Sequence, residues 1–217
     1  MTDNKFLVGY YGFWVILTYL NAVSGLVGMY FALAGNIRYA LICLMFAGLC
    51  DGLDGRVASL KERNDREKSY GIQIDALSDI ISFGFLPVIL GYVIITGYNV
   101  QLYTYLYLTI SVIFILASLI RLAYFNVIEN EHLNKNEKRF FFEGLPVTTV
   151  SILIPIVYSL CCVFNISMIL IYTIILAALS IAYVTRFKVP KPRGRALVLL
   201  CLATLPAAIY IIFFGGN

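Results

Sequence analysis

Four aspartates in this sequence have a side-chain type and a spacing that could support catalysis. Asp51 and Asp54 are three residues apart and Asp75 and Asp79 are four apart, so each pair shares one helix face. The surrounding sequence is apolar, and a carboxylate inside a membrane costs on the order of 3 kcal/mol, which usually marks a functional site. Small residues lie one turn from the aspartates on the same helix faces and leave room for a bulky ligand: Gly55, Ala58 and Gly71.

The four carboxylates would repel one another without a cation, because no basic residue lies on the same helix faces. Hard oxygen ligands favour Mg²⁺ or Mn²⁺ over zinc, and four carboxylates can hold two such ions. Paired divalent ions suit a substrate that carries a diphosphate. The residues alone predict a metal-dependent phosphoryl or phosphatidyl transferase at a membrane surface. Two alternatives are acids solvated at helix ends and an ion-coupled transporter, whose carboxylates usually lie near the bilayer midplane.

The composition predicts that helices in a membrane position these acids. Of the 217 residues, 61% are hydrophobic and 13% are charged, against about 45–50% and 25% in ordinary globular chains. A soluble protein of this size could not bury so much apolar surface. The 16 Tyr and 15 Phe exclude disorder, and the five cysteines in apolar stretches argue against a disulfide scaffold. No basic-aromatic motif indicates nucleic-acid binding.

We expect an all-α, polytopic membrane protein with about seven transmembrane helices in one domain over residues 1–217. Since about 20 apolar residues cross the hydrocarbon core, the expected spans are 15–35, 38–59, 72–97, 101–125, 145–164, 166–186 and 195–214. With the N-terminus inside, all of the 16 basic residues except Arg38 lie on the inner side, as do all 12 acids. This asymmetry places the acids at the cytoplasmic face, which is that of the cytoplasmic membrane if the protein is bacterial.

The acid pairs lie in a recognisable motif. The segments DGLDGRVA (51–58) and GIQIDALSD (71–79) resemble the signature of the CDP-alcohol phosphotransferases, D-x-x-D-G-x-x-A-R followed by G-x-x-x-D-x-x-x-D. Seven of its eight fixed positions are present. Ser59 stands at the position of the signature arginine, and the spacer of eleven residues, 60–70, is longer than usual. In the family that arginine is thought to hold the nucleotide diphosphate, and the candidates to replace it here are Arg56, Arg63 and Arg66.

Further segments are similar to those of phosphatidylserine synthases within this family. They are Thr18-x-x-Asn21-x-x-x-Gly25, SFG (82–84), RLAYFN (121–126) and GLP (144–146). The resemblance implies a membrane enzyme of the CDP-alcohol phosphotransferase fold that acts as a homodimer among membrane lipids. It implies transfer of the phosphatidyl group from CDP-diacylglycerol to L-serine, with release of CMP and with Mg²⁺ or Mn²⁺ in a two-ion site.

The resemblance also implies roles for individual residues. Asp51, Asp54, Asp75 and Asp79 would bind the metal ions, and Asp79 would also act as the general base on the serine hydroxyl. The residues expected to bind the nucleotide are Thr18, Asn21, Asp51, Gly55, Ala58, Ser59, Gly71 and Asp75.

The acceptor site is predicted from chemistry, because the carboxylate of serine needs a cation. Arg121, at the inner end of the fourth span, could provide bidentate contacts to it, and Ser82 and Asn126 are further candidates. The same chemistry with glycerol 3-phosphate or inositol phosphate is the nearest alternative, although a phosphorylated acceptor should need more basic residues. A non-catalytic member is another alternative, because of Ser59. The single Trp14 is expected to anchor the chain at the membrane interface.

Overall fold

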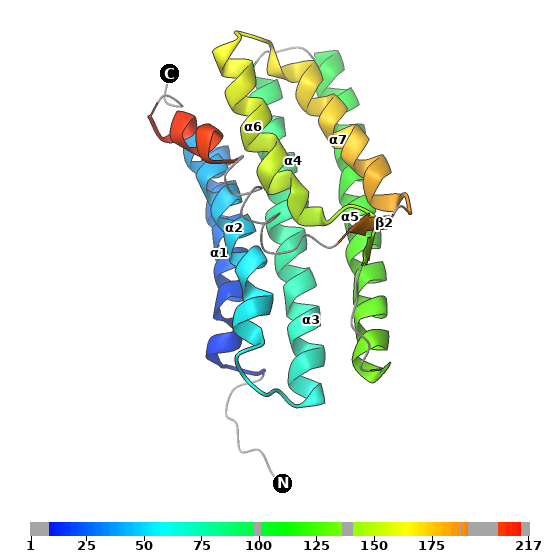
Figure 1. Cartoon of the computed structure of the whole chain (residues 1–217). Coiled ribbons are helices and arrows are strands. Elements are labelled where there is room, and N and C mark those ends of the chain that lie inside the picture. The colour runs from blue at the N-terminus through cyan, green and yellow to red at the C-terminus, as the bar shows by residue number, and fades with distance from the viewer. Residues whose placement is uncertain (1–8, 98–100, 136–140, 187, 191–203, 214–217) are drawn as a thin grey trace.

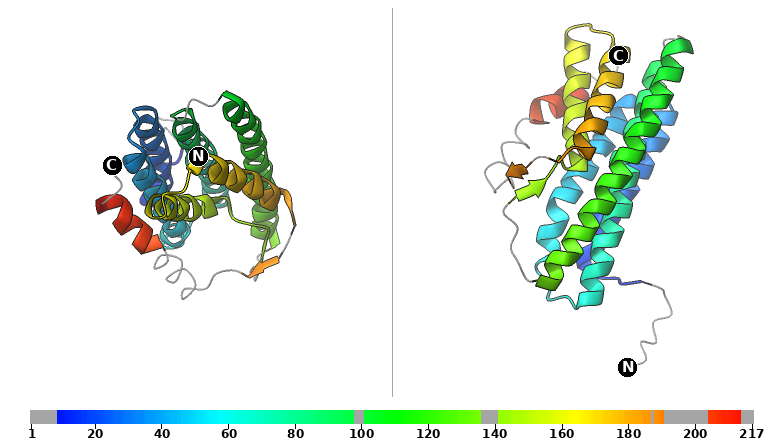
Figure 2. Two further views of the ribbon diagram at one scale, coloured as in Figure 1. Left: turned by 90° about the horizontal axis from the view of Figure 1, so that it is seen from above. Right: turned by 90° about the vertical axis from the view of Figure 1, so that its right-hand side faces the viewer.

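The described chain is a bundle of helices that run side by side (Figure 1). The computed structural model describes residues 9–97, 101–135, 141–186, 188–190 and 204–213. Its main helices are α1 (Ile16–Leu33), α2 (Ile37–Ala58), α3 (Asp65–Asp79), α4 (Leu86–Thr96), α5 (Gln101–Lys135), α6 (Val150–Val163) and α7 (Met168–Val184). A 3-10 turn (Phe13–Val15) precedes α1, another (Val147–Thr149) precedes α6, and a π-helical turn (Ile80–Phe85) joins α3 to α4. A last helix, Thr204–Phe213, lies at the outer edge of the bundle and runs crosswise to the other helices, as the view from above in Figure 2 shows.

The helices differ in length, so the two ends of the bundle are built from different sets of helices. Helix α5 has 35 residues and the continuous helix Asp65–Thr96 has 32, which correspond to about 52 and 48 Å. Both exceed the hydrocarbon core of about 30 Å. Helices α6 and α7 are shorter and flank only the upper half of the bundle, whereas α1, α2, α3 and α5 extend below them (Figure 1). The lower end therefore projects beyond the region that all the helices share.

The surface of the bundle fits a membrane. Three described helices are long and apolar enough to cross one: Phe13–Leu33, Asp65–Thr96 and Gln101–Glu129. Large apolar side chains such as Tyr30, Ile174 and Ile181 are more than half exposed on the outside of the bundle. Such a surface is costly in water but favourable in lipid. The all-α membrane class expected from the sequence is confirmed.

Several boundaries differ from those expected. The third span was predicted to begin at 72, but α3 begins seven residues earlier, at Asp65, because its polar start is stabilised by a capping box. Helix α5 continues ten residues beyond the expected 125. Of the expected seventh span, residues 195–203 lie outside the described residues. An antiparallel pair of three-residue strands, β1 (Phe141–Glu143) and β2 (Lys188–Pro190), was not expected.

The π-helical turn between α3 and α4 has a local cause. Pro87 lies within the continuous helix, where it offers no N–H and its ring crowds the carbonyl four residues earlier. The helix widens just before it, at Ile80–Phe85, and then resumes. Tyr172 donates a hydrogen bond to the Pro87 carbonyl at 2.7 Å, and Tyr107 donates one to the Val88 carbonyl at 2.6 Å. These contacts tie the helix that carries Asp79 to α5 and α7.

Candidate active site

Three of the four aspartates form a cluster near the lower end of the bundle. Asp51 and Asp54 lie on the last turns of α2, and Asp75 lies on α3, the next helix of the chain. One carboxylate oxygen from each residue lies within 4.8 Å of the others. The chain reverses between the two helices, so the expected helical stripes face each other. Three carboxylates at this spacing form a donor set that fits a hard divalent cation.

Asp79 lies one turn beyond Asp75 and has a different environment. It is buried, and Asn21 of α1 donates a hydrogen bond from Nδ2 to its Oδ1 at 2.9 Å. Two oxygens of this region, Oδ1 of Asp75 and Oδ1 of Asn21, are buried without a hydrogen-bond partner among the described residues. Buried oxygens rarely remain unpaired, so these two atoms also fit a site that a cation completes.

Helix α1 is held against α3 and the π-helical turn that follows it by a set of hydrogen bonds. Ser78 donates to the Thr18 carbonyl and Ser82 donates to the Asn21 carbonyl, both at 2.8 Å. The Thr18 hydroxyl donates to Oδ2 of Asp54 at 3.4 Å. One turn further along, a Cβ at Gly25 would lie 2.9 Å from the Cα of Ser82. The Thr18, Asn21 and Gly25 positions therefore bring α1 close enough to α3 for Asn21 to reach Asp79.

A cavity of about 190 Å³ lies beside the carboxylate cluster. Five of the eight residues expected to bind the nucleotide line it, namely Thr18, Gly55, Ala58, Gly71 and Asp75, and so does Asp54, which was expected to bind metal. The other lining residues are Trp14, Val15, Arg63, Ile72, Phe125, Asn126 and Glu129. A Cβ at Gly55 would meet no atom within 4 Å, so packing within the protein does not require glycine there. The space above Gly55 is available to a ligand.

The comparison with known families agrees with this geometry. The model of the CDP-alcohol phosphatidyltransferase family matches residues 15–182. The chain belongs to the CDP-alcohol phosphatidyltransferase family. The family expected from the signature is thus confirmed, and the matched residues include the four aspartates and every residue that lines the cavity except Trp14.

Relatives within the CDP-alcohol phosphatidyltransferases carry names that specify an acceptor. The chain is 30% identical over 158 residues, 73% of its length, to an archaetidylserine synthase of Methanothermobacter thermautotrophicus. It is 30% identical over 64% of its length to a CDP-diacylglycerol–serine O-phosphatidyltransferase of Helicobacter pylori. It is 34% identical over 65% of its length to a protein of the same name in Saccharomyces cerevisiae. The matches cover 62%, 54% and 52% of these three relatives.

The position of the signature arginine of the CDP-alcohol phosphatidyltransferases lies away from the cavity. Ser59 follows the last residue of α2, is exposed, and donates from Oγ to the carbonyl of Arg56 at 2.6 Å. It therefore caps the end of its own helix and is not among the residues that line the cavity. The structure does not bring Ser59 to the place where we expected it to contact a nucleotide.

The structure places the three candidates for acceptor binding in different environments. Asn126 lines the cavity. Arg121 is buried one to two turns away, and its Nε donates to the Leu145 carbonyl at 3.1 Å. A Cβ at Gly144, whose φ is +80°, would lie 3.2 Å from Nη1 of Arg121. Arg121 thus packs against the turn 144–146, and Ser82 is used in the contact with α1 described above.

Trp14 was expected at the membrane interface, and this expectation is wrong. Its side chain is only 3% exposed, packs against Ala58 and lines the cavity. The 3-10 turn Phe13–Val15 folds the indole inward, which a hydropathy pattern does not show. Glu129 was also missed, although it follows Asn126 by three residues on α5 and so shares its helix face.

Two glycines of α2 provide a matched test of the cavity. We expect Gly55→Leu to raise the KM for the substrate that occupies the cavity at least tenfold, because the new side chain would fill space that the protein leaves open. Gly52→Leu should leave KM within twofold, because Gly52 also meets no atom within 4 Å but does not line the cavity. Steady-state kinetics and thermal unfolding of the purified variants measure both effects. Equal KM changes in the two variants would contradict the assignment of the cavity.

Proposed function

We propose that this protein transfers the phosphatidyl group of CDP-diacylglycerol, or of its ether-linked counterpart, to the hydroxyl of L-serine and releases CMP. The observation that carries the proposal is the carboxylate cluster of Asp51, Asp54 and Asp75 beside a cavity lined by Gly55 and Gly71. Family membership supports the use of a CDP-linked donor, and the names of the relatives support serine as the acceptor.

In the proposed reaction the serine hydroxyl oxygen forms a bond to the lipid-side phosphorus, and the bond from that phosphorus to the oxygen of CMP breaks. Asp79 accepts the hydroxyl proton, and Asn21 holds Asp79 in place by the hydrogen bond at 2.9 Å. Asp51, Asp54, Asp75 and Asp79 would hold two Mg²⁺ or Mn²⁺ ions, which supply positive charge to the diphosphate and to the departing CMP. Thr18 donates to Asp54 and so orients one member of the cluster.

We place the acceptor beside the end of α5 that reaches the cavity. Asn126 lines the cavity and can donate hydrogen bonds to the carboxylate of serine. Glu129 lines the same wall and offers a negative charge to the ammonium group. In this proposal Arg121 supports the site indirectly, by holding the turn that contains Leu145. The two ends of a zwitterionic acceptor would then meet groups of suitable chemistry.

The proposal also includes the membrane side and the assembly. The basic residues of the sequence favour the cytoplasmic face for the site, and the lipid chains of the donor would lie along the apolar outer faces of the helices. The homodimer remains a prediction from the resemblance. Native mass spectrometry of the protein in detergent would test it, and a monomer at concentrations where activity is measured would contradict it.

The experiment that tests the function is CMP release by the purified protein from CDP-diacylglycerol in Mn²⁺ or Mg²⁺. The acceptor panel is L-serine, glycerol 3-phosphate and inositol phosphate. We expect release that requires both L-serine and the metal. Release only with a phosphorylated acceptor would keep the reaction but overturn serine as the acceptor. No release with any acceptor, from protein that unfolds cooperatively, would overturn the transferase and favour the non-catalytic and transport alternatives.

A further inference from the structure

Arg63 has a special position among the basic residues at the lower end of the bundle. It lies in the connection between α2 and α3 and is the one cation among the described residues that line the cavity. Its side chain is partly buried, whereas Arg56 and Arg66 are exposed and do not line the cavity. The sequence offered Arg56, Arg63 and Arg66 as equal candidates to contact the diphosphate, and only Arg63 lines the cavity in the structure.

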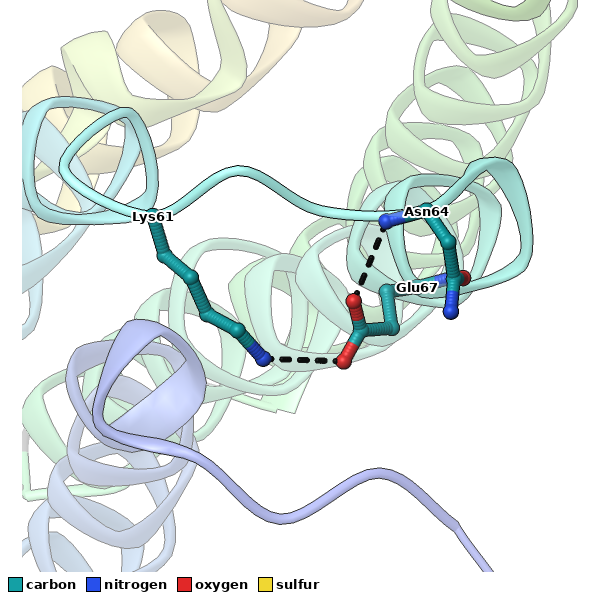
Figure 3. Close-up of polar contacts among 3 residues, drawn as sticks. All are labelled: Lys61, Asn64 and Glu67. Atoms are coloured by element: carbon teal, nitrogen blue, oxygen red, sulfur yellow. Dashed lines mark hydrogen bonds and ion pairs between the residues drawn. The ribbon is translucent and has the colours of Figure 1, made fainter.

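Four of the charges near Arg63 are paired with one another. Lys61 forms an ion pair with Glu67 at 3.0 Å, and Lys68 forms one with Asp65 at 3.3 Å. Figure 3 shows that Glu67 also accepts a hydrogen bond from the Asn64 backbone, which fixes both sides of the connection. No ion pair involves Arg63 in the part of the chain that the structure describes. Its guanidinium can therefore contact an anionic ligand in the cavity, while its charge also acts on Asp54.

Arg63 is also held in a defined place. Its guanidinium carbon lies 5.3 Å from the centroid of the Trp14 ring, a distance typical of a cation–π contact. On the α3 side, Nη1 lies 3.2 Å from the point that a Cβ at Gly71 would occupy. Trp14 itself is set by Gly12, where a Cβ would lie 2.5 Å from the indole Nε1. The guanidinium is therefore oriented before a ligand arrives.

We propose that Arg63 binds the diphosphate of the CDP-linked donor in place of the signature arginine, and that Trp14 is its positioning residue. A guanidinium is suited to this task because its donors can contact two phosphate oxygens at once. Asp54 and Asp75 line the same cavity, so a diphosphate bound there would meet both the guanidinium and a cation that the carboxylates would hold. Ser59, bonded to its own helix end, leaves this role open. The inference rests on the proposed function.

Binding of CDP to the full-length protein in Mn²⁺ tests the inference without turnover. Trp14 is the single tryptophan of the chain, so its fluorescence reports binding in the wild type, and calorimetry serves for every variant. We expect Arg63→Ala to weaken CDP binding tenfold or more and Arg63→Lys to weaken it less. Arg66→Ala, a change in the same charged segment, should stay within twofold.

A double-mutant cycle tests the role of Trp14. Trp14→Leu keeps an apolar side chain but removes the ring face, and we expect it to weaken CDP binding in the wild type and to have little further effect in Arg63→Ala. Additive losses would overturn the positioning role. A wild-type affinity in Arg63→Ala, or no CDP binding by the folded wild type, would overturn the inference. Arg63-dependent CDP binding without CMP release would support the inference while contradicting the proposed transfer to an acceptor.

Discussion

Asp75→Asn is expected to reduce CMP release by more than 100-fold, beyond the 10–100-fold typical of changes that only support a metal ligand. Asp75 contributes one of three carboxylate oxygens that lie within 4.8 Å of one another, and its Oδ1 is buried without a partner among the described residues. The amide is nearly the same size but carries no charge. The loss should therefore come from metal binding and not from a change in packing.

The same substitution should change stability in opposite directions with and without metal. In EDTA the variant should unfold at a temperature at least as high as that of the wild type, because one of three neighbouring like charges is gone. In Mn²⁺ the order should reverse, since a cation at 100 times its Kd stabilises the native state by about 2.7 kcal/mol. Thermal unfolding of both proteins in both buffers measures the effect.

Glu62→Gln is the matched control for this prediction. It removes one carboxylate from an exposed position in the connection between α2 and α3. We expect it to keep the activity and the Mn²⁺-dependent stabilisation of the wild type. If Asp75→Asn were stabilised by Mn²⁺ as strongly as the wild type, the cluster of Asp51, Asp54 and Asp75 would not be the metal site.

Features that repeat along a helix could be predicted from the sequence. Asp51 and Asp54 share one face of their helix because a turn has 3.6 residues. The short connection makes the next helix, which carries Asp75, an antiparallel neighbour. The structure accordingly gathers these three side chains. Family resemblance added Thr18 and Asn21, whose contacts with acids more than 30 residues away no local pattern could indicate.

Features that depend on irregular backbone could not be predicted. Trp14 enters the cavity because of a 3-10 turn, and Arg63 reaches it because the connection between α2 and α3 is fixed by Asn64 and Glu67. Neither conformation has a periodic sequence signal. The early start of α3 was missed for a related reason, since a hydropathy window ends where polar residues begin, although hydrogen bonds of the capping box continue the helix.

Asp79→Asn is expected to reduce kcat by about 10²–10⁴-fold, which is the usual contribution of a positioned general base. The side chain keeps its size, and its Oδ1 can still accept the hydrogen bond from Asn21 that the structure shows at 2.9 Å. The substitution removes the group proposed to accept the serine proton. Three of the four carboxylates proposed to bind metal, the cluster of Asp51, Asp54 and Asp75, are unchanged in this variant, so CDP binding and most of the Mn²⁺-dependent stabilisation should remain.

This combination shows whether Asp79 acts mainly as the general base or mainly as a metal ligand. Rapid-mixing measurements of CMP release at saturating donor and serine give the chemical step, and thermal unfolding in Mn²⁺ gives the metal effect for the same preparation. A large fall in both the rate of the chemical step and the Mn²⁺-dependent stabilisation would show that Asp79 acts mainly as a metal ligand. An unchanged kcat would exclude Asp79 as the base. Asn21→Leu extends the test, because it leaves the buried carboxylate of Asp79 without its donor. We expect it to reduce kcat by about 10–100-fold, less than Asp79→Asn, because the base is still present but no longer held in place.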